Sequence, residues 1–352
     1  MVATLPHLPE LLRSFLGREP EGSLVSLKAE LSPRHYHRFV PAQPPRSAGA
    51  DQRRSLMVME LPDDGPDGPS REQARAFIDV QRFLSERGLP VPEIFAVDLP
   101  HGLLLLEDLG DETFEARLRA RGRAAWAELY GQAIDLLARL HAAGKPGQDP
   151  AACIALRRRF ETSLLRWELD HFREWGLEAQ VAPLAAADRS ALDAQFDALT
   201  AALAALPDGF VHRDYQSRNL IWAPDGRLVI LDFQDAFIGP APYDLVALLC
   251  DSYVELDAEL QNAMLERYCA ARGFGAAERA ITFEGFRLIA VQRKLKDAGR
   301  FVFIDRKRGN PNYLPFYPGS LAYVVRALRE LPQFAALHAL LVRLVPAYAA
   351  LA

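Results

Sequence analysis

The chain has 352 residues, which is enough for one large domain or for two lobes that each bury a core. Half of the residues are apolar and the net charge is only −5, so the composition excludes a disordered chain and offers no basic excess for nucleic-acid binding. Three widely spaced cysteines, no signal-peptide pattern in residues 1–16 and no run of about 20 apolar residues lead us to expect a cytoplasmic protein that does not bind membranes.

The first third of the chain alternates short apolar runs with loops rich in Pro, Gly and Asp. We predict strands over residues 23–28, 35–40, 55–61, 93–97 and 102–106, and a helix over 70–87. Ser70, followed by Arg-Glu-Gln, has the pattern of a capping box, so we expect it to cap this helix. The resulting order of elements, β-β-β-α-β-β, is typical of the nucleotide-binding lobe of a kinase.

Amphipathic helical patterns dominate the rest of the chain. We predict helices over residues 124–141, 155–175, 186–206, 242–254, 257–272, 276–299, 320–331 and 333–350. We interpret residues 107–110 as a hinge whose backbone at Glu107 and Leu109 meets the adenine edge of a nucleotide; a solvated turn is the alternative. We therefore expect an N-terminal nucleotide-binding lobe over residues 1–108 and a C-terminal catalytic and substrate-binding lobe over residues 109–352.

The most informative feature is Asp214 in a His-Arg-Asp motif, followed by Asn219 and, at the end of the next apolar run, by Asp232. The apolar runs at 220–222 and 227–231 are joined by a turn that contains Asp-Gly. This predicts a β-hairpin, which would bring Asn219 and Asp232 near each other. An Asp, an Asn five residues later and a second Asp on the following strand form the active-site pattern of kinases.

Each of these three residues has a chemical role in that pattern. Asp214 would be the catalytic base that accepts the proton of the attacking hydroxyl, while Asn219 and Asp232 would bind Mg²⁺, which prefers oxygen ligands. The pattern predicts an enzyme that uses ATP and Mg²⁺, with an α+β, protein-kinase-like bilobal fold: a β-rich N-terminal lobe and an α-rich C-terminal lobe. Only seven residues separate Asp232 from Pro240 and no Ala-Pro-Glu follows, so we expect a small-molecule acceptor and no protein partner.

With these motifs the chain resembles the aminoglycoside phosphotransferase-like superfamily. Within it, the chain is most similar to the anomeric N-acetylmuramate/N-acetylglucosamine kinases of bacterial cell-wall recycling. The matching stretches, between about residues 88 and 301, are GLPVPEIFAVDLPHGLLLLEDLGDETF, HRDYQSRNL, LVILDFQDAFIGPAPYDLVALLCDSY and VQRKLKDAGRF. The resemblance implies that ATP phosphorylates the anomeric hydroxyl of either amino sugar to the 1-phosphate, in peptidoglycan recycling. It also implies a nucleotide loop over residues 30–38, in which Ser32, Arg34 and Tyr36 match the family pattern.

The third predicted strand departs from the general kinase pattern because it contains no lysine. The charge that this lysine supplies to the ATP phosphates must come from another residue, or the site is catalytically inactive. Arg34 is our candidate for binding the nucleotide phosphates, with Lys28 and Arg38 behind it. The alternative is that Arg34 is a solvated arginine at the end of a strand.

A basic segment over residues 284–308 holds eight Lys or Arg against three acidic residues and matches the Gln-Arg-x-x-Lys region of the family. This segment suits an acceptor with a carboxylate, such as N-acetylmuramate, and not a polycationic aminoglycoside. We expect Arg293 to bind the substrate, and Asp235, Glu168 and Tyr243 to line the sugar site. The alternative for each of them is a structural role.

The sequence thus predicts an amino-sugar kinase whose partner is a small molecule. Two alternatives stay open: another small-molecule kinase, acting on an aminoglycoside, choline or another amino alcohol, or a nucleotide-binding pseudokinase. The missing lysine favours the pseudokinase, and the intact Asp214, Asn219 and Asp232 oppose it.

Overall fold

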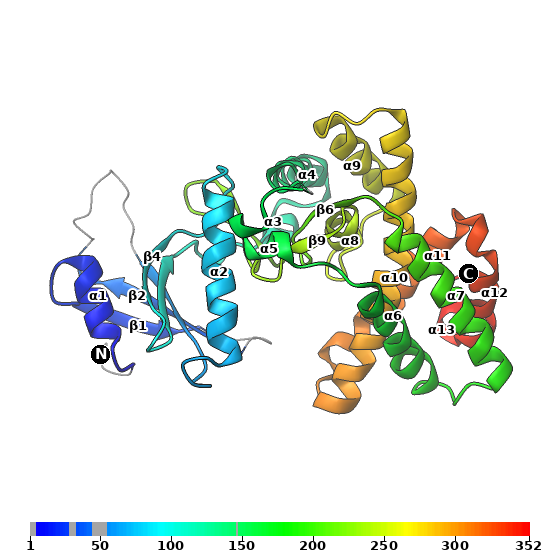
Figure 1. Ribbon diagram of the computed structural model, residues 1–352, viewed down its shortest axis with the longest axis horizontal. Helices are drawn as coiled ribbons and strands as arrows, with labels where there is room; N and C mark the ends of the chain where they lie inside the picture. Colours follow the sequence, from blue (N-terminus) through cyan, green and yellow to red (C-terminus); the bar gives the residue numbers. More distant parts are fainter. Residues whose placement is uncertain (1–4, 28–32, 44–54, 146) are drawn as a thin grey trace. The chain divides into compact units, whose positions relative to one another are not determined.

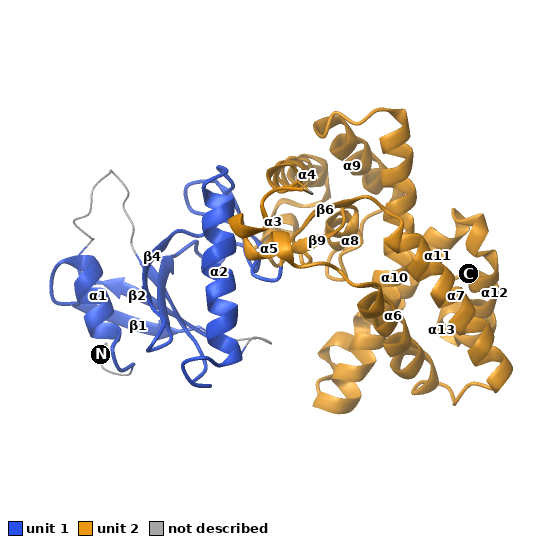
Figure 2. Ribbon diagram, viewed as in Figure 1, with its two compact units in different colours: residues 1–112, 220–235 blue, residues 113–219, 236–352 orange. Residues whose placement is uncertain are grey.

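The computed structural model describes residues 5–27, 33–43, 55–145 and 147–352. The chain forms two compact units, coloured separately in Figure 2: residues 1–112 with 220–235, and residues 113–219 with 236–352. The first unit thus runs beyond the expected boundary at residue 108 and includes a later segment. That segment carries the predicted hairpin, β7 (Leu220–Trp222) and β8 (Leu228–Ile230). It belongs to the first unit because Ile221, Ala223 and Val229 pack with Leu109.

A five-stranded antiparallel sheet forms the centre of the first unit, with strands in the order β1-β2-β3-β5-β4. All five predicted strands and the predicted helix are present, as β1 (Gly22–Ser26), β2 (His35–Pro41), β3 (Leu56–Glu60), α2 (Pro69–Ser85), β4 (Ile94–Asp98) and β5 (Leu103–Glu107). Strand β5 is buried on both faces, because its side chains alternate and all four leucines are covered. Figure 1 shows helix α2 running along this sheet.

Helix α1 (Leu8–Leu16) is not among the predicted elements. Its leucines at positions 8, 11, 12 and 16 have the helical period and are buried against Phe39 of β2 and the neighbouring side chains of β3 and β5. The helix ends at Gly17, whose φ of 66° lies in the left-handed region that glycine adopts without strain. The leucine spacing was the available signal for this helix.

The start of α2 differs from the predicted capping box. Gly68 is the N-cap residue and Pro69 occupies the first helical turn, so Ser70 lies inside the helix and does not cap it. Proline is favoured at this position because its fixed φ suits a helix start. The Ser70 N–H instead donates to the Asp64 carboxylate at 2.8 Å. Asp64, a loop residue, thus supplies the acceptor for one of the backbone N–H groups that lack a partner within the first turn of the helix.

Helices make up most of the second unit. The α-helices are α3 (Phe114–Arg121), α4 (Trp126–Ala143), α5 (Ile154–Arg157), α6 (Thr162–His171), α7 (Ala186–Ala204), α8 (Tyr243–Leu249), α9 (Ala258–Ala271), α10 (Ala276–Arg308), α11 (Tyr317–Arg329), α12 (Ala335–Leu344) and α13 (Pro346–Ala349). Strands β6 (Asp208–Val211) and β9 (Phe237–Pro240) pair antiparallel. Short 3₁₀ helices are η1 (Arg123–Ala125), η2 (Pro150–Ala152), η4 (Pro311–Phe316) and η5 (Pro332–Phe334), and η3 (Phe172–Glu178) is a π-helix.

Several predicted helices have different limits in the structure. The helix predicted over 242–254 ends earlier, as α8, and the helix predicted over 333–350 is divided into η5, α12 and α13. The helix predicted over 155–175 is interrupted after α5, because the Arg158 carbonyl and the Phe160 N–H hydrogen-bond with Ile238 of β9, at 2.9 and 3.2 Å. The helix predicted from residue 276 continues to Arg308 and ends at Gly309, whose φ is 63°. No helix in the described part of the chain is long and apolar enough to cross a membrane.

Close contacts with neighbouring helices hold α10 in place. A Cβ atom on Gly299 would lie 2.7 Å from the Phe172 Cα atom, and a Cβ on Gly176 would lie 3.3 Å from the Gly299 Cα atom. Only glycine allows this approach between η3 and α10. The Tyr317 hydroxyl of α11 donates to the Gly176 carbonyl at 2.7 Å and holds the same junction.

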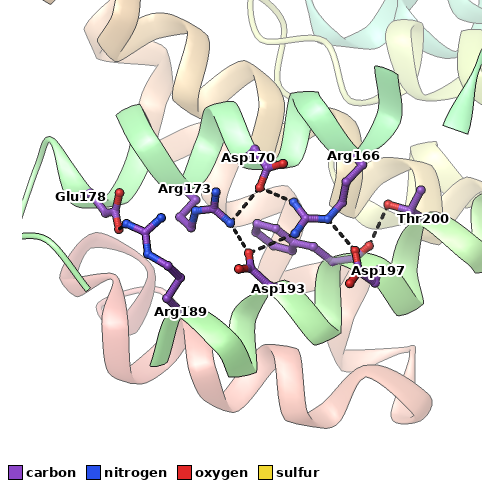
Figure 3. Close-up of polar contacts among 9 residues, drawn as sticks. Arg166, Asp170, Arg173, Glu178, Arg189, Asp193, Asp197 and Thr200 are labelled. Carbon is purple, nitrogen blue, oxygen red and sulfur yellow. Dashed lines mark hydrogen bonds and ion pairs between the residues drawn. The ribbon is translucent and has the colours of Figure 1, made fainter. Parts of the chain in front are cut away.

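An ion-pair network joins α6 and η3 to α7, as Figure 3 shows. Arg166 contacts Asp170, Asp193 and Asp197, and Arg173 contacts Asp170 and Asp193. These side chains are partly exposed, so each pair contributes at most about 1 kcal/mol, and the network gains strength from the shared aspartates. Together with the glycine contacts, the network fixes the helices on which α10 rests.

Candidate active site

The predicted catalytic loop follows β6 and is fixed by two buried carboxylates of the second unit. Asp244 of α8 accepts the N–H groups of His212 at 2.7 Å and Arg213 at 2.9 Å. Asp251 accepts the N–H of Ser217 at 2.8 Å. Arg213 has a φ of 82°, an unusual value for a residue with a side chain, and such strain is often stored at functional sites. Asp244 and Asp251 therefore stabilise the strained backbone conformation of the catalytic loop.

Asp244 also links the loop to the helices behind it. His141 of α4 contacts the Asp244 carboxylate through Nε2 at 3.1 Å and the Tyr268 hydroxyl of α9 through Nδ1 at 2.7 Å. Burial lowers the pKa of His141 below its ordinary value, although the neighbouring Asp244 acts in the opposite direction. Asp244 and His141 were not predicted as site residues; the available signal was the Tyr-Asp-Leu segment within the resemblance.

Asp214 projects from this loop with an accessible carboxylate. Its side chain is 40% exposed and its Oδ1 accepts a hydrogen bond from Arg293 Nη2 at 3.1 Å. Burial raises the pKa of Asp214, but the positive charges of Arg293, Lys296 and Arg213 outweigh it and hold this pKa below its ordinary value. The carboxylate is therefore ionised at neutral pH and is held in one orientation.

Arg293 of α10 braces the loop from the interior. Its side chain is 6% exposed, its Nη1 donates to the Arg213 carbonyl at 2.8 Å, and its guanidinium lies 4.7 Å from the centre of the Tyr243 ring. Both edges of the guanidinium are thus used by residues of the catalytic loop. The sequence led us to expect Arg293 to bind the substrate, whereas the structure shows it bound to Asp214 and to the backbone beside it.

Asn219 is tied to the same loop. Its side-chain Nδ2 donates to the Asp214 carbonyl at 2.9 Å, and its backbone N–H donates to the Gln216 carbonyl at 2.9 Å. The amide nitrogen is committed to the loop, so the amide oxygen is the atom that can bind a cation. Asn219 immediately precedes β7 of the hairpin.

The remaining predicted sugar-site residues differ in their surroundings. Glu168 of α6 is buried and accepts a hydrogen bond from Gln292 Nε2 at 2.7 Å. Tyr243 is buried, and burial raises its pKa above the ordinary value, against the nearby charges of Lys296 and Arg293. These two residues and Arg293 belong to one cluster in the second unit, whereas Asp235 is partly exposed at the end of residues 220–235 in the first.

Asp232 lies in the first unit, two residues after β8. Its φ of 60° is in the left-handed region, and Gln234 Nε2 donates to its Oδ1 at 2.8 Å. The next residue, Phe233, is fully buried and stacks on Phe77 of α2 with ring centres 4.9 Å apart. The buried ring anchors the strained backbone, so Asp232 presents an exposed carboxylate from a fixed position.

Arg34 is buried against α2, so it is not a solvated strand-end arginine. The residue is only 5% exposed, and its Nη2 donates to Gln73 Oε1 at 3.2 Å. Burial raises the pKa of the neighbouring Tyr36, while the charge and hydrogen bond of Arg34 lower it. Ser32, which we expected to bind the nucleotide, and Lys28 lie outside the described residues.

The hinge residues are held by charged pairs of the first unit. The Glu107 carboxylate contacts Arg227 of the hairpin, and the Glu107 N–H donates to the Glu93 carbonyl at 2.9 Å. Arg38 Nε binds Asp108 at 2.6 Å, and its guanidinium also reaches Asp111. Arg38 is therefore engaged at the hinge, which leaves Arg34 as the stronger candidate for the phosphates.

Within the described ranges, no group of three or more His, Cys, Asp or Glu side chains could hold a metal ion. A magnesium site does not require one, because Mg²⁺ keeps several waters and binds through one or two carboxylates together with substrate phosphates. The exposed Asp232 carboxylate and the amide oxygen of Asn219 are oxygen donors of the type that Mg²⁺ prefers.

Comparisons with known proteins identify the family of this chain. Residues 47–281 match the model of the phosphotransferase enzyme family. The chain belongs to this family. An N-acetylmuramate/N-acetylglucosamine kinase of Pseudomonas aeruginosa is 33% identical over 96% of this chain and 93% of the relative. An N-acetylmuramate/N-acetylglucosamine kinase of Neisseria meningitidis serogroup B is 32% identical over 83% of this chain and 84% of the relative.

The fold of the phosphotransferase family is also found in solved structures. A crystal structure of an aminoglycoside phosphotransferase with ADP bound has a TM-score of 0.57 at 14% identity, and the match covers 90% of this chain and 97% of that one. The predicted α+β, protein-kinase-like fold is confirmed, as are the predicted family and the prediction of a kinase.

This phosphotransferase lacks the usual lysine on its third strand, and the structure shows what stands there instead. Met57 and Met59 of β3 pair in register with Arg38 and Tyr36 of β2. Arg34, immediately before β2, is a buried cation of the same unit and is held by Gln73 of α2. Gln73 was not predicted as a site residue, because its contact with Arg34 joins segments that are distant in the sequence.

Proposed function

We propose that this phosphotransferase transfers the γ-phosphoryl group of ATP to the anomeric hydroxyl of N-acetylmuramate or N-acetylglucosamine, giving the 1-phosphate, as a cytoplasmic step of peptidoglycan recycling. The observation that carries the proposal is the accessible, ionised Asp214, in a family member whose relatives, matched over most of the chain, are named N-acetylmuramate/N-acetylglucosamine kinases. The neighbouring cations support a neutral or anionic acceptor and disfavour choline and aminoglycosides, which are cationic.

Asp214 would orient the attacking hydroxyl and accept its proton. Because the lowered pKa makes Asp214 a weak base, its main contribution would be orientation, with proton transfer late in the reaction. An anomeric hydroxyl is more acidic than an ordinary alcohol, which suits a weak base. Arg293 would keep the carboxylate aimed at the acceptor, and Asp244 would keep the loop in its strained conformation.

Asn219 and Asp232 are the residues that we propose as ligands of Mg²⁺. When bound, the ion would bridge the ATP phosphates and neutralise their charge. The Asn219 amide nitrogen would stay on the Asp214 carbonyl, so that binding at the amide oxygen is coupled to the position of the base.

Arg34 would take the place of the missing lysine. In protein kinases the lysine of the third strand is held by a glutamate of the next helix. Here α2 is that helix in the order of elements, and its Gln73 holds Arg34. Backbone groups of Glu107 and Leu109 would contact the adenine, and Ser32 would contact the phosphates. Asp235, Glu168 and Tyr243 are the remaining candidates for the sugar site.

The test is an acceptor panel with purified protein, ATP and Mg²⁺. ATP consumption should depend on N-acetylmuramate or N-acetylglucosamine, and choline or kanamycin should give no more than the background without acceptor. Turnover with choline or kanamycin alone would assign another small-molecule kinase. Nucleotide binding without turnover on any acceptor would assign a pseudokinase.

A further inference from the structure

Three cations of one stretch of α10 lie near the catalytic loop, and two of them already have partners that hold them. Arg293 binds Asp214 and the Arg213 carbonyl. Lys294 has a side chain that is 2% exposed, and its ammonium donates to the Ser252 hydroxyl at 2.6 Å and to Asp297 Oδ2 at 2.9 Å. Neither can turn to a substrate without breaking these contacts.

Lys296 differs from both. Its side chain is 20% exposed, and its closest acidic contact is Asp297 Oδ1 at 3.6 Å, on the carboxylate that Lys294 already holds at 2.9 Å. Lys296 follows Arg293 by three residues, so the two side chains lie on one face of the helix, one turn apart. Since Arg293 ends at Asp214, Lys296 lies one helical turn from the residue that holds the base, and its side chain is partly exposed.

The electrostatics of the cluster agree with this placement. The positive charge of Lys296 helps to lower the pKa of Asp214, second to Arg293 among the nearby charges, against the effect of burial. It also acts on Tyr243, against the effect of burial on that phenol. Lys296 is therefore close to the base and to the residue proposed to line the sugar site.

We propose that Lys296 binds the lactyl carboxylate of N-acetylmuramate and so favours this acceptor over neutral sugars. The inference rests on the proposed function. The two proposed acceptors differ in this group, because N-acetylglucosamine has a hydroxyl where N-acetylmuramate carries the lactyl ether. An ammonium on a flexible stem, with three donors, can meet a carboxylate on such an arm. Arg293 is then a positioning residue, and Lys296, in place of Arg293, gives the preference for the acceptor with a carboxylate.

The experiment compares Lys296→Met with the unmodified protein on both sugars. Methionine keeps the length and the apolar stem of the side chain and removes the charge. A hydrogen bond to a charged group corresponds to a loss of about 10- to 100-fold, so kcat/KM for N-acetylmuramate should fall by that factor while kcat/KM for N-acetylglucosamine changes less than about threefold. The KM for ATP should stay unchanged, and Lys296→Arg should recover part of the preference.

A control on the same helix is Lys307→Met, because Lys307 is exposed near the end of α10 and lies over the Trp175 ring, away from the residues of the cluster. This variant should leave both sugars unaffected. Equal losses on both sugars with Lys296→Met, or a raised KM for ATP, would overturn the inference and assign Lys296 to phosphate binding or folding.

A second measurement needs no variant and covers the case in which Lys296→Met does not fold. The unmodified protein should use N-acetylmuramate about tenfold or more better than its neutral methyl ester. Equal use of acid and ester would overturn the inference, while phosphorylation of both sugars would still support the proposed function. If the protein phosphorylates neither sugar, the result contradicts the proposed function itself.

Discussion

Replacing Arg293 with alanine should slow catalysis and change its dependence on pH. The variant removes the hydrogen bond to Asp214 at 3.1 Å and the one to the Arg213 carbonyl at 2.8 Å. A hydrogen bond to a charged group contributes about 1.5–3 kcal/mol, and the 40% exposure of Asp214 favours the lower end. We therefore expect kcat to fall about 10- to 30-fold, since 1.4 kcal/mol is a factor of ten.

The direction of the pH effect follows from the charges around Asp214. Burial raises the pKa of this carboxyl, and Arg293 is the largest of the charges that lower it. In the unmodified protein Asp214 stays ionised, and activity is lost only as the pH falls through the lowered pKa. Without Arg293 the pKa rises, so the acid limb of kcat/KM, which reports the free enzyme, should move to higher pH.

The assay is steady-state kinetics from about pH 3 to about pH 9 on the best amino sugar, with folding at each pH checked by a thermal melt. Arg287→Ala removes an arginine of the same helix that pairs with Glu330 and should leave the profile unchanged. Arg293→Lys keeps the positive charge, so its acid limb should lie closer to that of the unmodified protein. Lysine cannot reproduce both hydrogen bonds of the guanidinium, so the recovery should be partial. A folded Arg293→Ala protein with an unshifted acid limb would refute the role given to Arg293.

Three further sets of variants test other parts of the account. Asp232→Asn should nearly abolish turnover by removing a charged ligand of Mg²⁺, and Asn219→Ala should cost less; kinetics across Mg²⁺ concentrations decide this, and near-normal activity of Asp232→Asn at saturating Mg²⁺ would contradict the assignment. Arg34→Ala should lower kcat and raise the KM for ATP without changing the KM for the sugar, and a change in the sugar KM alone would place Arg34 elsewhere. Gly299→Ala should lower the free energy of unfolding by about 1–3 kcal/mol in a denaturant melt. Gly319→Ala, in α11 with open space around it, should raise that free energy by up to about 1 kcal/mol. Equal effects of the two variants would contradict the close packing described for α10.

The local parts of the fold could be predicted from the sequence. The five strands of the sheet, helix α2 and the β7–β8 hairpin follow from apolar runs and turn residues that act within a few positions. The break after α5 could not, because it depends on hydrogen bonds between Arg158, Phe160 and Ile238, which are remote in the chain. The prediction that Ser70 caps α2 is wrong because Pro69 occupies the first helical turn and Gly68 is the N-cap residue.

The site shows the same limit. The types and spacing of Asp214, Asn219 and Asp232 could be read as a kinase pattern, since they lie close together in the sequence. The partner of Asp214 could not be identified, because Arg293 comes from α10 some 80 residues later, and a basic segment alone does not show which charge is paired. Gln73, which holds Arg34, was hidden in the same way.

Phosphorus NMR of the reaction products tests the central claim most directly. The unmodified protein, ATP, Mg²⁺ and either amino sugar should give a sugar phosphate whose phosphorus couples to the anomeric proton. Asp214→Asn should form the same product more slowly, by about 10²–10⁴-fold, because the amide keeps the shape of the side chain but cannot accept the proton. A phosphate at another position, no sugar phosphate at all, or an undiminished rate in a folded Asp214→Asn protein would contradict the account.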